Sequence, residues 1–111
     1  MDAVTHDEKS VDQIFHALSD ATRRDILTRV IRHEQSVSEL AVRYAMSFAA
    51  VQKHVAVLER AALVVKERRG KQQIVHGELS TVHSAAQLLG QYEQLWIART
   101  QRIGDILTEH E

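Results

Sequence analysis

The segment SFAAVQKH, residues 47–54, combines side chains that can make directed polar contacts with small ones that let another molecule approach closely. A serine opens the segment, and Gln52, Lys53 and His54 follow in succession. Glutamine can accept from the N6 amino group of adenine and donate to its N7, and lysine can reach guanine O6 and N7 or a phosphate. The segment therefore predicts a surface that reads base edges in a DNA groove. The alternative for Gln52 and Lys53 is an ordinary solvated surface.

The other groups of this segment each have two interpretations. The Ser47 hydroxyl can cap a helix, and the capped N-terminus then favours a phosphate. Phe48 and Ala49 can touch a thymine methyl group, although Phe48 can equally be buried against the preceding helix. His54 can bond a phosphate or simply pack. We predict DNA contacts for all four residues.

A second polar cluster surrounds Gly70 and consists of Arg68, Arg69, Lys71 and Gln72. Cations at such a turn can lie along the DNA backbone or enter a minor groove, or they can only keep an exposed turn soluble. Arg23 and Arg24 can hold phosphates as well, or they can pair with Asp20 or Glu39. We predict that Arg23 and the four residues of the cluster contact DNA.

The spacing of apolar residues indicates the elements that hold these groups. It predicts four helices, within residues 11–18, 19–34, 36–45 and 47–61. Ser36 and Glu39 have the spacing of a capping box, and Ser19 or Asp20 can cap the second helix. The fourth helix has an apolar face formed by Val51, Val55 and Leu58.

Residues 63–79 change to a period of two, which predicts two short strands joined by a basic turn at Gly70. Gly77 marks the end of the second strand. The short third helix, a tight turn and the fourth helix then form a helix-turn-helix, and the hairpin forms a wing.

Residues 80–108 keep an apolar spacing of three and four, close to a heptad seam. A helix of about 27 residues spans about 40 Å, which is too long for so small a domain to cover. We therefore predict that this helix joins two copies of the chain, and that the interface contains Val82, Leu89, Tyr92, Trp96, Ile103 and, from the first helix, Ile14. The alternative is a helix folded back on its own core.

Composition limits the remaining classes of protein. The chain has 111 residues and neither proline nor cysteine, which favours one domain with long helices and excludes disulfides and thiolate metal sites. The net charge of −1 conceals a basic segment, residues 47–77, with six Lys and Arg against two Glu, and such a segment favours an anionic partner. The N-terminus is unlike a signal peptide, and no apolar run reaches the ~20 residues that span a bilayer. We expect a cytoplasmic protein without membrane association.

Two other classes of protein are alternatives to a DNA-binding protein. The sequence has no G-x-S-x-G, no H-E-x-x-H and no glycine-rich phosphate loop, so we expect that it is not an enzyme. A winged-helix module that binds protein instead of DNA would keep the fold but would need no basic wing.

Four stretches in order resemble the ArsR-type winged helix-turn-helix transcriptional regulators over about residues 11–79: LSDATRRDIL, SVSELA, MSFAAVQKHVAVLERAALV and the strand residues that follow. The tail LGQYEQLWIARTQRIGDIL is similar to the last helix of members without a metal site. The resemblance implies a homodimeric repressor, often autoregulatory, whose two recognition helices enter successive major grooves of double-stranded DNA.

Metal sites of that family provide a further comparison. One site uses Cys-x-Cys in the short helix, where this chain has ELAVRYA without a thiol. Another uses Asp, His and His or Glu on facing final helices, and here His83, Glu93 and Asp105 lack its paired spacing. We predict neither a metal nor another cofactor. For the inducing signal three alternatives stay open: a small apolar ligand near Tyr92 and Trp96, a partner protein, or no ligand.

These features together predict a mainly α fold with a small β-hairpin, arranged as a single winged helix-turn-helix domain over residues 1–111. Residues 1–10 are expected to be flexible, 11–79 to form the core with the wing, and 80–108 to form a long C-terminal dimerisation helix. The predicted function is that of a sequence-specific transcriptional repressor, a homodimer on a pseudo-palindromic operator.

Overall fold

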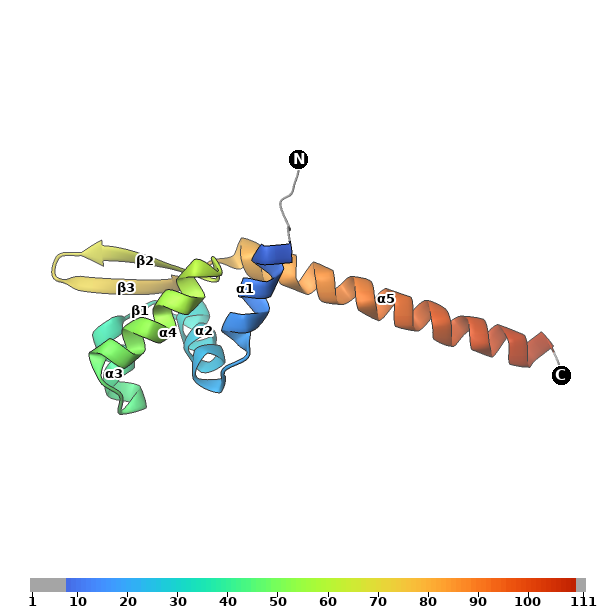
Figure 1. The fold of residues 1–111 in the computed structure, drawn as a ribbon, viewed down its shortest axis with the longest axis horizontal. Coiled ribbons are helices and arrows are strands. Elements are labelled where there is room, and N and C mark those ends of the chain that lie inside the picture. The colour runs from blue at the N-terminus through green and yellow to red at the C-terminus, as the bar shows by residue number, and fades with distance from the viewer. Residues whose placement is uncertain (1–7, 110–111) are drawn as a thin grey trace. The chain divides into compact units, whose positions relative to one another are not determined.

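The computed structural model describes residues 8–109 and confirms a mainly helical fold with a small antiparallel sheet (Figure 1). In chain order the elements are α1 Glu8–Leu18, α2 Ala21–Arg32, β1 Gln35–Ser36, α3 Val37–Tyr44, α4 Phe48–Arg60, β2 Val64–Arg69, β3 Gln72–Gly77 and α5 Leu79–Glu109. The chain divides after Thr81 into two compact units. We call the first the winged unit and the second the helical unit.

Two elements differ from the sequence prediction. α1 begins at Glu8, so the predicted flexible segment overlaps this helix at residues 8–10, while residues 1–7 lie outside the described residues. A third strand, β1, pairs antiparallel with β3 and gives the sheet the order β1-β3-β2. Because β1 has two residues, it is too short to produce a periodicity in the sequence.

Side-chain caps begin three of the helices, as the spacing predicts. Ser36 accepts from the Glu39 backbone N–H at 3.0 Å while the Glu39 carboxylate accepts from the Ser36 N–H at 2.8 Å, which confirms the capping box of α3. Of the two candidates for α2, Asp20 is the cap, because its carboxylate accepts from the Arg23 N–H at 3.0 Å. Such caps stabilise a helix by about 1 kcal/mol each.

Both helices of the helix-turn-helix end on an alanine in the left-handed region. Ala45, after α3, has φ 53°, and Ala62, after α4, has φ 59°. Around Ala62 the Leu63 N–H bonds the Leu58 carbonyl at 3.0 Å and the Ala62 N–H bonds the Glu59 carbonyl at 2.9 Å. This is the bonding of a Schellman motif, in which glycine is the usual residue.

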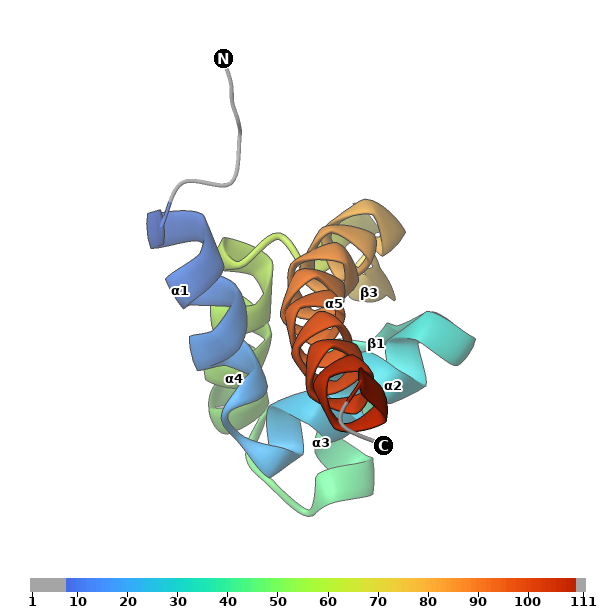
Figure 2. The ribbon, with the colours of Figure 1, turned by 90° about the vertical axis from the view of Figure 1, so that its right-hand side faces the viewer.

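The core of the winged unit is formed where α2, α3 and α4 meet the sheet, with α1 beside α4 (Figure 2). Its most deeply buried side chains, at 2% exposure or less, include Ile26, Val37, Leu40, Val51, Val55, Leu58, Leu63, Val64 and Val75. Burial of each such side chain contributes about 1.5–3 kcal/mol, so packing against this core holds α4 and the hairpin in place. In the described part of the chain, no helix is both long enough and apolar enough to cross a membrane.

Candidate nucleic-acid interface

α4 has one packed face and one accessible face. Val51, Val55 and Leu58 are 0% exposed. On the other side Ser47, Ala49 and Lys53 are exposed, and Gln52 and His54 are half-buried at the edges. The predicted separation of the two faces is therefore confirmed.

Phe48 lies on the accessible side of α4. Its side chain is 47% exposed, so the alternative in which the preceding helix buries it is wrong. Ser47, directly before it, is the N-cap: its hydroxyl accepts from the Ala50 N–H at 3.1 Å. An exposed helix N-terminus carries the positive end of the helix dipole and unpaired N–H groups, which together suit a phosphate.

Gln52 does not project freely from α4. Its Nε2 donates to Oε1 of Gln73 on β3 at 2.8 Å. This bond joins the helix-turn-helix to the wing. No sequence motif indicates Gln73, and only the register of the hairpin, together with the orientation of α4, brings the two amides together.

The register of the hairpin sorts the cations of the wing onto two faces. Arg68 is paired with Gln73 and Lys66 with Val75, and directly paired residues lie on the same face of a sheet. Gln73 bonds α4, and the Lys66 ammonium lies 3.7 Å from the Glu59 carboxylate of α4. Arg68 is therefore on the α4 face of the wing.

Arg69 lies on the opposite face. Its guanidinium donates to both carboxylate oxygens of Glu34, at 2.5 and 3.1 Å, and to Glu67 at 2.5 Å. These hydrogen bonds hold the pKa of the Glu34 carboxyl below its ordinary range and raise the pKa of Arg69. With two carboxylates beside it, this arginine adds little positive potential for a phosphate. Gln72, its paired neighbour on β3, is exposed on the same face.

The remaining cations of the wing are Arg68 and Lys71, beside Gly70. Gly70 has φ +61°, the left-handed conformation that a two-residue turn needs and glycine adopts readily. Arg68 Nε donates to the Gly70 carbonyl at 3.2 Å, and both cationic side chains are exposed. Within residues 8–109 neither has a carboxylate at ion-pair distance.

Arg23 is engaged with the chain itself. Its Nε donates to the Ala17 carbonyl at 2.8 Å and its Nη2 to the His16 carbonyl at 3.1 Å. It thus bonds carbonyls at the C-terminal end of α1. Arg24 does the same for Leu18 at 2.7 Å. Neither pairs with Glu39, whose carboxylate is used in the capping box.

His54 lies where α4 meets the start of α2. Its Nδ1 is 3.4 Å from Arg23 Nη1 and 3.9 Å from the Asp20 carboxylate. The backbone N–H of Arg23 holds the pKa of Asp20 below its ordinary range, so the carboxylate stays charged beside this ring. The ring is therefore packed against charged neighbours at the edge of the accessible face.

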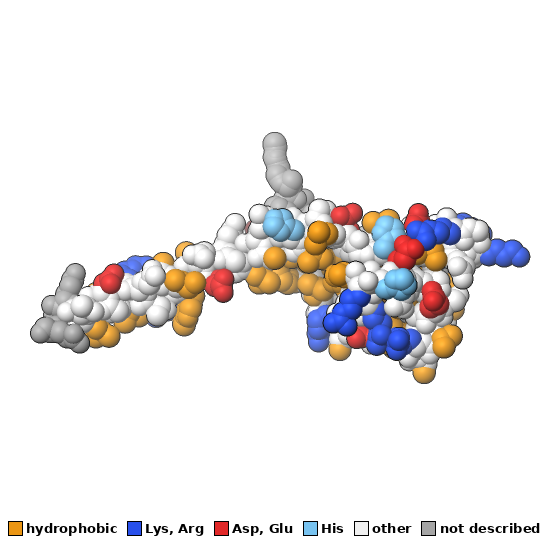
Figure 3. All heavy atoms as spheres, turned by 180° about the vertical axis from the view of Figure 1, so that it is seen from behind, with side chains coloured by type: hydrophobic (Ala, Val, Ile, Leu, Met, Phe, Trp, Pro, Cys, Tyr) orange, Lys and Arg blue, Asp and Glu red, His pale blue; other side chains and the backbone are white. Residues whose placement is uncertain are grey.

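The predicted dimer residues of α5 are mostly accessible. Exposure is 54% for Leu89, 63% for Tyr92, 66% for Trp96 and 49% for Ile103, and Val82 is half-buried. Figure 3 shows hydrophobic side chains gathered along this helix. Ile14 differs, because at 6% exposure its side chain has almost no surface left for a second copy.

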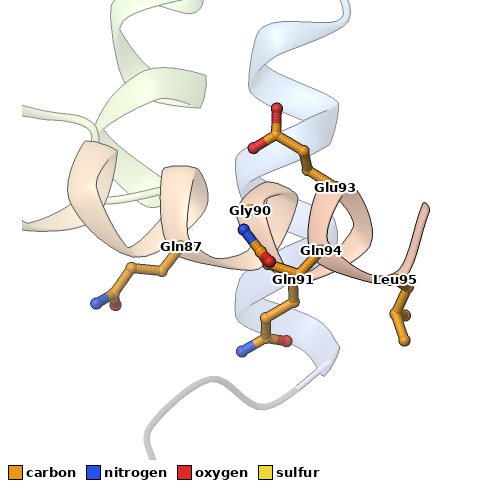
Figure 4. A pocket seen from close by; sticks show the side chains of 6 residues that line it. All are labelled: Gln87, Gly90, Gln91, Glu93, Gln94 and Leu95. Atoms are coloured by element: carbon orange, nitrogen blue, oxygen red, sulfur yellow. The ribbon is translucent and has the colours of Figure 1, made fainter. Parts of the chain in front are cut away.

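α5 also bears a shallow hollow, shown in Figure 4. Six residues of this one helix line it: Gln87, Gly90, Gln91, Glu93, Gln94 and Leu95. Tyr92 and Trp96 do not line this hollow, although a small apolar ligand near them is one of the three alternatives for the inducing signal. Within residues 8–109 no three His, Asp or Glu side chains gather in a way that could hold a metal ion.

A helix-turn-helix with an accessible second helix, followed by a hairpin that contacts it, defines a winged helix-turn-helix domain. No family model matches the chain. YuzN of Bacillus subtilis (strain 168), an uncharacterized HTH-type transcriptional regulator, is 42% identical over 71 residues, which are 58% of this chain and 77% of YuzN. An ArsR-like transcriptional regulator from Rhodococcus sp. RHA1 has a TM-score of 0.80 at 31% identity, covering 93% of this chain and 94% of that one.

A third relative shares the fold at lower identity. It is a homodimeric winged helix-turn-helix DNA-binding domain from Mycobacterium bovis, a possible ArsR-family regulator, with a TM-score of 0.64 at 20% identity over 78% of this chain and 81% of that one. The present chain belongs to the ArsR family of helix-turn-helix transcriptional regulators. It is accordingly a DNA-binding transcriptional regulator.

Proposed function

We propose that this regulator is a homodimeric repressor in the cytoplasm that binds a pseudo-palindromic operator through α4 and the α4 face of the wing. The observation that supports this most is the division of α4. Gln52 and Lys53 lie among small and capping residues on the accessible side, while the opposite side is fully buried. A helix held in this way can enter a major groove without loss of core packing.

The contacts divide by their chemistry. Gln52 and Lys53 meet base edges, and Phe48 and Ala49 meet thymine methyl groups. Ser47, Arg68 and Lys71 meet phosphates, which supply affinity without sequence information. Arg69, Gln72 and Arg23 lie outside this set, because Arg69 is paired with carboxylates, Gln72 shares its face of the wing, and Arg23 closes α1.

A homodimer would contact both half-sites of the proposed operator. The exposed apolar residues of α5 need a partner, and a second α5 offers the same surface in return. Two α4 helices related by a two-fold axis would read half-sites with centres about 34 Å apart. The homodimeric relative from Mycobacterium bovis supports this arrangement. Repression follows from the family resemblance, and a reporter gene placed behind the operator tests it: expression is expected to fall when the regulator is supplied.

Gln52→Ala tests the assignment of α4. We expect specific affinity to fall by about 1–3 kcal/mol per half-site, because a bidentate contact to a base is lost. Affinity for random duplex should stay within about twofold, since phosphate contacts are untouched. The measurement is titration of both duplexes at two salt concentrations. A steep loss at high salt is expected for every DNA complex of this chain.

Gln35→Ala is the matched control, since it removes a half-buried amide from β1, which is separated from β2 by β3 and is not among the predicted DNA contacts. It should leave both affinities unchanged. If Gln52→Ala weakened both duplexes equally, Gln52 would not be a base reader. If the native chain bound neither duplex at low salt, a winged-helix module for a protein partner would replace this proposal.

A further inference from the structure

The amides of Gln52 and Gln73 come from different parts of the winged unit. Gln52 is on α4 and Gln73 is on β3, 21 residues later in the chain. Both side chains are half-buried, and Gln52 Nε2 donates to Gln73 Oε1 at 2.8 Å. The acceptor is therefore part of the wing, while the donor belongs to the recognition helix.

A glutamine amide has two N–H donors and one acceptor oxygen. When it is free it can turn over, and the donor and acceptor positions are then exchanged. Adenine in the major groove needs an acceptor for its N6 amino group and a donor for N7. The bidentate contact to adenine uses Oε1 and the N–H on the same side as Oε1, so this pair remains available when Gln73 accepts from the other N–H of Gln52.

We propose that Gln73 is a positioning residue for base recognition: it fixes the amide of Gln52 in the orientation that selects adenine. This inference rests on the proposed function, in which Gln52 reads a base. It adds that specificity depends on a wing residue that needs no base contact of its own. A shift of β3 relative to α4 would change what α4 reads.

The first arm of the test needs no DNA. The side-chain amide protons of Gln52 are followed by ¹⁵N NMR in the full chain, with Gln52→Ala for assignment. Gln73→Ala should move these signals and speed their exchange with water. Gln73→Glu should keep exchange slow, because a carboxylate can accept but cannot donate. Gln35→Ala should leave the signals in place.

The second arm measures base discrimination. Operators selected by the native chain are resynthesised with each base at the position whose preference Gln52→Ala abolishes. Native discrimination by a bidentate pair is roughly 5- to 150-fold. Gln73→Ala should lower this ratio several-fold while affinity for random duplex changes less than about twofold. Gln73→Glu should keep the ratio, although its added charge weakens binding to every duplex alike.

The double variant completes the cycle. Gln52→Ala with Gln73→Ala should discriminate no worse than Gln52→Ala alone, because the two residues act as one unit. An unchanged ratio in folded Gln73→Ala would overturn the proposal, as would a raised specific affinity, which would mean that Gln73 withholds Gln52 from DNA. If Gln52→Ala itself left every base preference intact, the proposed function would fail first and this inference with it. Thermal unfolding of each variant shows that it is folded.

Discussion

At the scale of single residues, the deciding question is which side of the wing each cation occupies. Arg68 and Arg69 are neighbours of the same type, and the sequence predicts a DNA contact for both. Strand alternation places them on opposite faces, and the register with β3 decides that Arg68 shares the face of α4. A sequence shows that the alternation exists, but a shift of one residue would exchange the two faces.

The two arginines should consequently behave differently. Arg68→Ala should weaken binding to all duplexes and reduce the slope of log affinity against log salt by about 1 for each protomer. Arg69→Ala should leave the slope nearly unchanged and instead loosen the wing from Glu34, which lies outside the hairpin. The measurement is the salt dependence of binding to random duplex. If Arg69→Ala flattened the salt dependence and Arg68→Ala did not, Arg69 and not Arg68 would be the phosphate contact.

At the scale of elements, local sequence signals determine most of the winged unit. The caps at Ser36 and Ser47 and the apolar faces of the helices are recognisable because they depend on residues within one or two turns. β1 and the bond between Gln52 and Gln73 depend on residues that are distant in the chain. They appear only when α4 and the hairpin are packed, so no local pattern could indicate them.

Ala45, in the turn of the helix-turn-helix, carries local strain. A left-handed residue other than glycine costs about 1–2 kcal/mol, and glycine costs about 0.5–1 kcal/mol in lost chain entropy. Ala45→Gly should therefore raise the thermal midpoint by a few degrees. Ala41→Gly, in the interior of α3, is the control and should lower it. A lower midpoint for Ala45→Gly would contradict the left-handed conformation.

Asp25 links α2 to α3. It accepts from the Tyr44 hydroxyl at 2.5 Å and from Arg29 Nε at 2.8 Å. The Tyr44 hydrogen bond, followed by that of Arg29, holds the pKa of the Asp25 carboxyl below its ordinary value, and burial raises the pKa of Tyr44 to about 12. Stability from Asp25 is thus present above its unfolded pKa of about 3.9 and is lost as the pH falls through its lower folded pKa.

Thermal unfolding between pH 6 and pH 2 measures this link. The thermal midpoint of the native chain should fall steeply below about pH 4. The Asp25→Asn variant should have a lower midpoint at pH 6, and this midpoint should fall less on acidification. Parallel curves for the two proteins would mean that other carboxylates, such as Glu34 and Glu39 with their lowered pKa values, dominate the acid response.

At the scale of the whole molecule, the proposed pseudo-palindromic operator requires two copies of the chain. α5 was predicted within a residue of its described bounds because its apolar spacing is long and regular. Its contacts with a second copy, which the apolar spacing predicts residue by residue, stay a prediction. Ile14, predicted for the interface, is instead buried at 6% exposure.

Trp96→Glu tests the pairing of α5. Trp96 is 66% exposed in the chain, and a carboxylate in an apolar seam would be strongly disfavoured. We expect monomers by sedimentation at micromolar concentration, with loss of operator binding and retention of weak binding to random duplex. If the variant stays dimeric, the interface between the two copies lies outside this part of α5.

If the accessible face of α4 reads DNA in duplicate, the native chain should select an inverted repeat from random duplexes. The half-site centres of this repeat should lie about one helical turn, roughly 34 Å, apart. An adenine preference in each half should disappear with Gln52→Ala. Enrichment of a single half-site, or a preference that survives Gln52→Ala unchanged, would contradict this proposal.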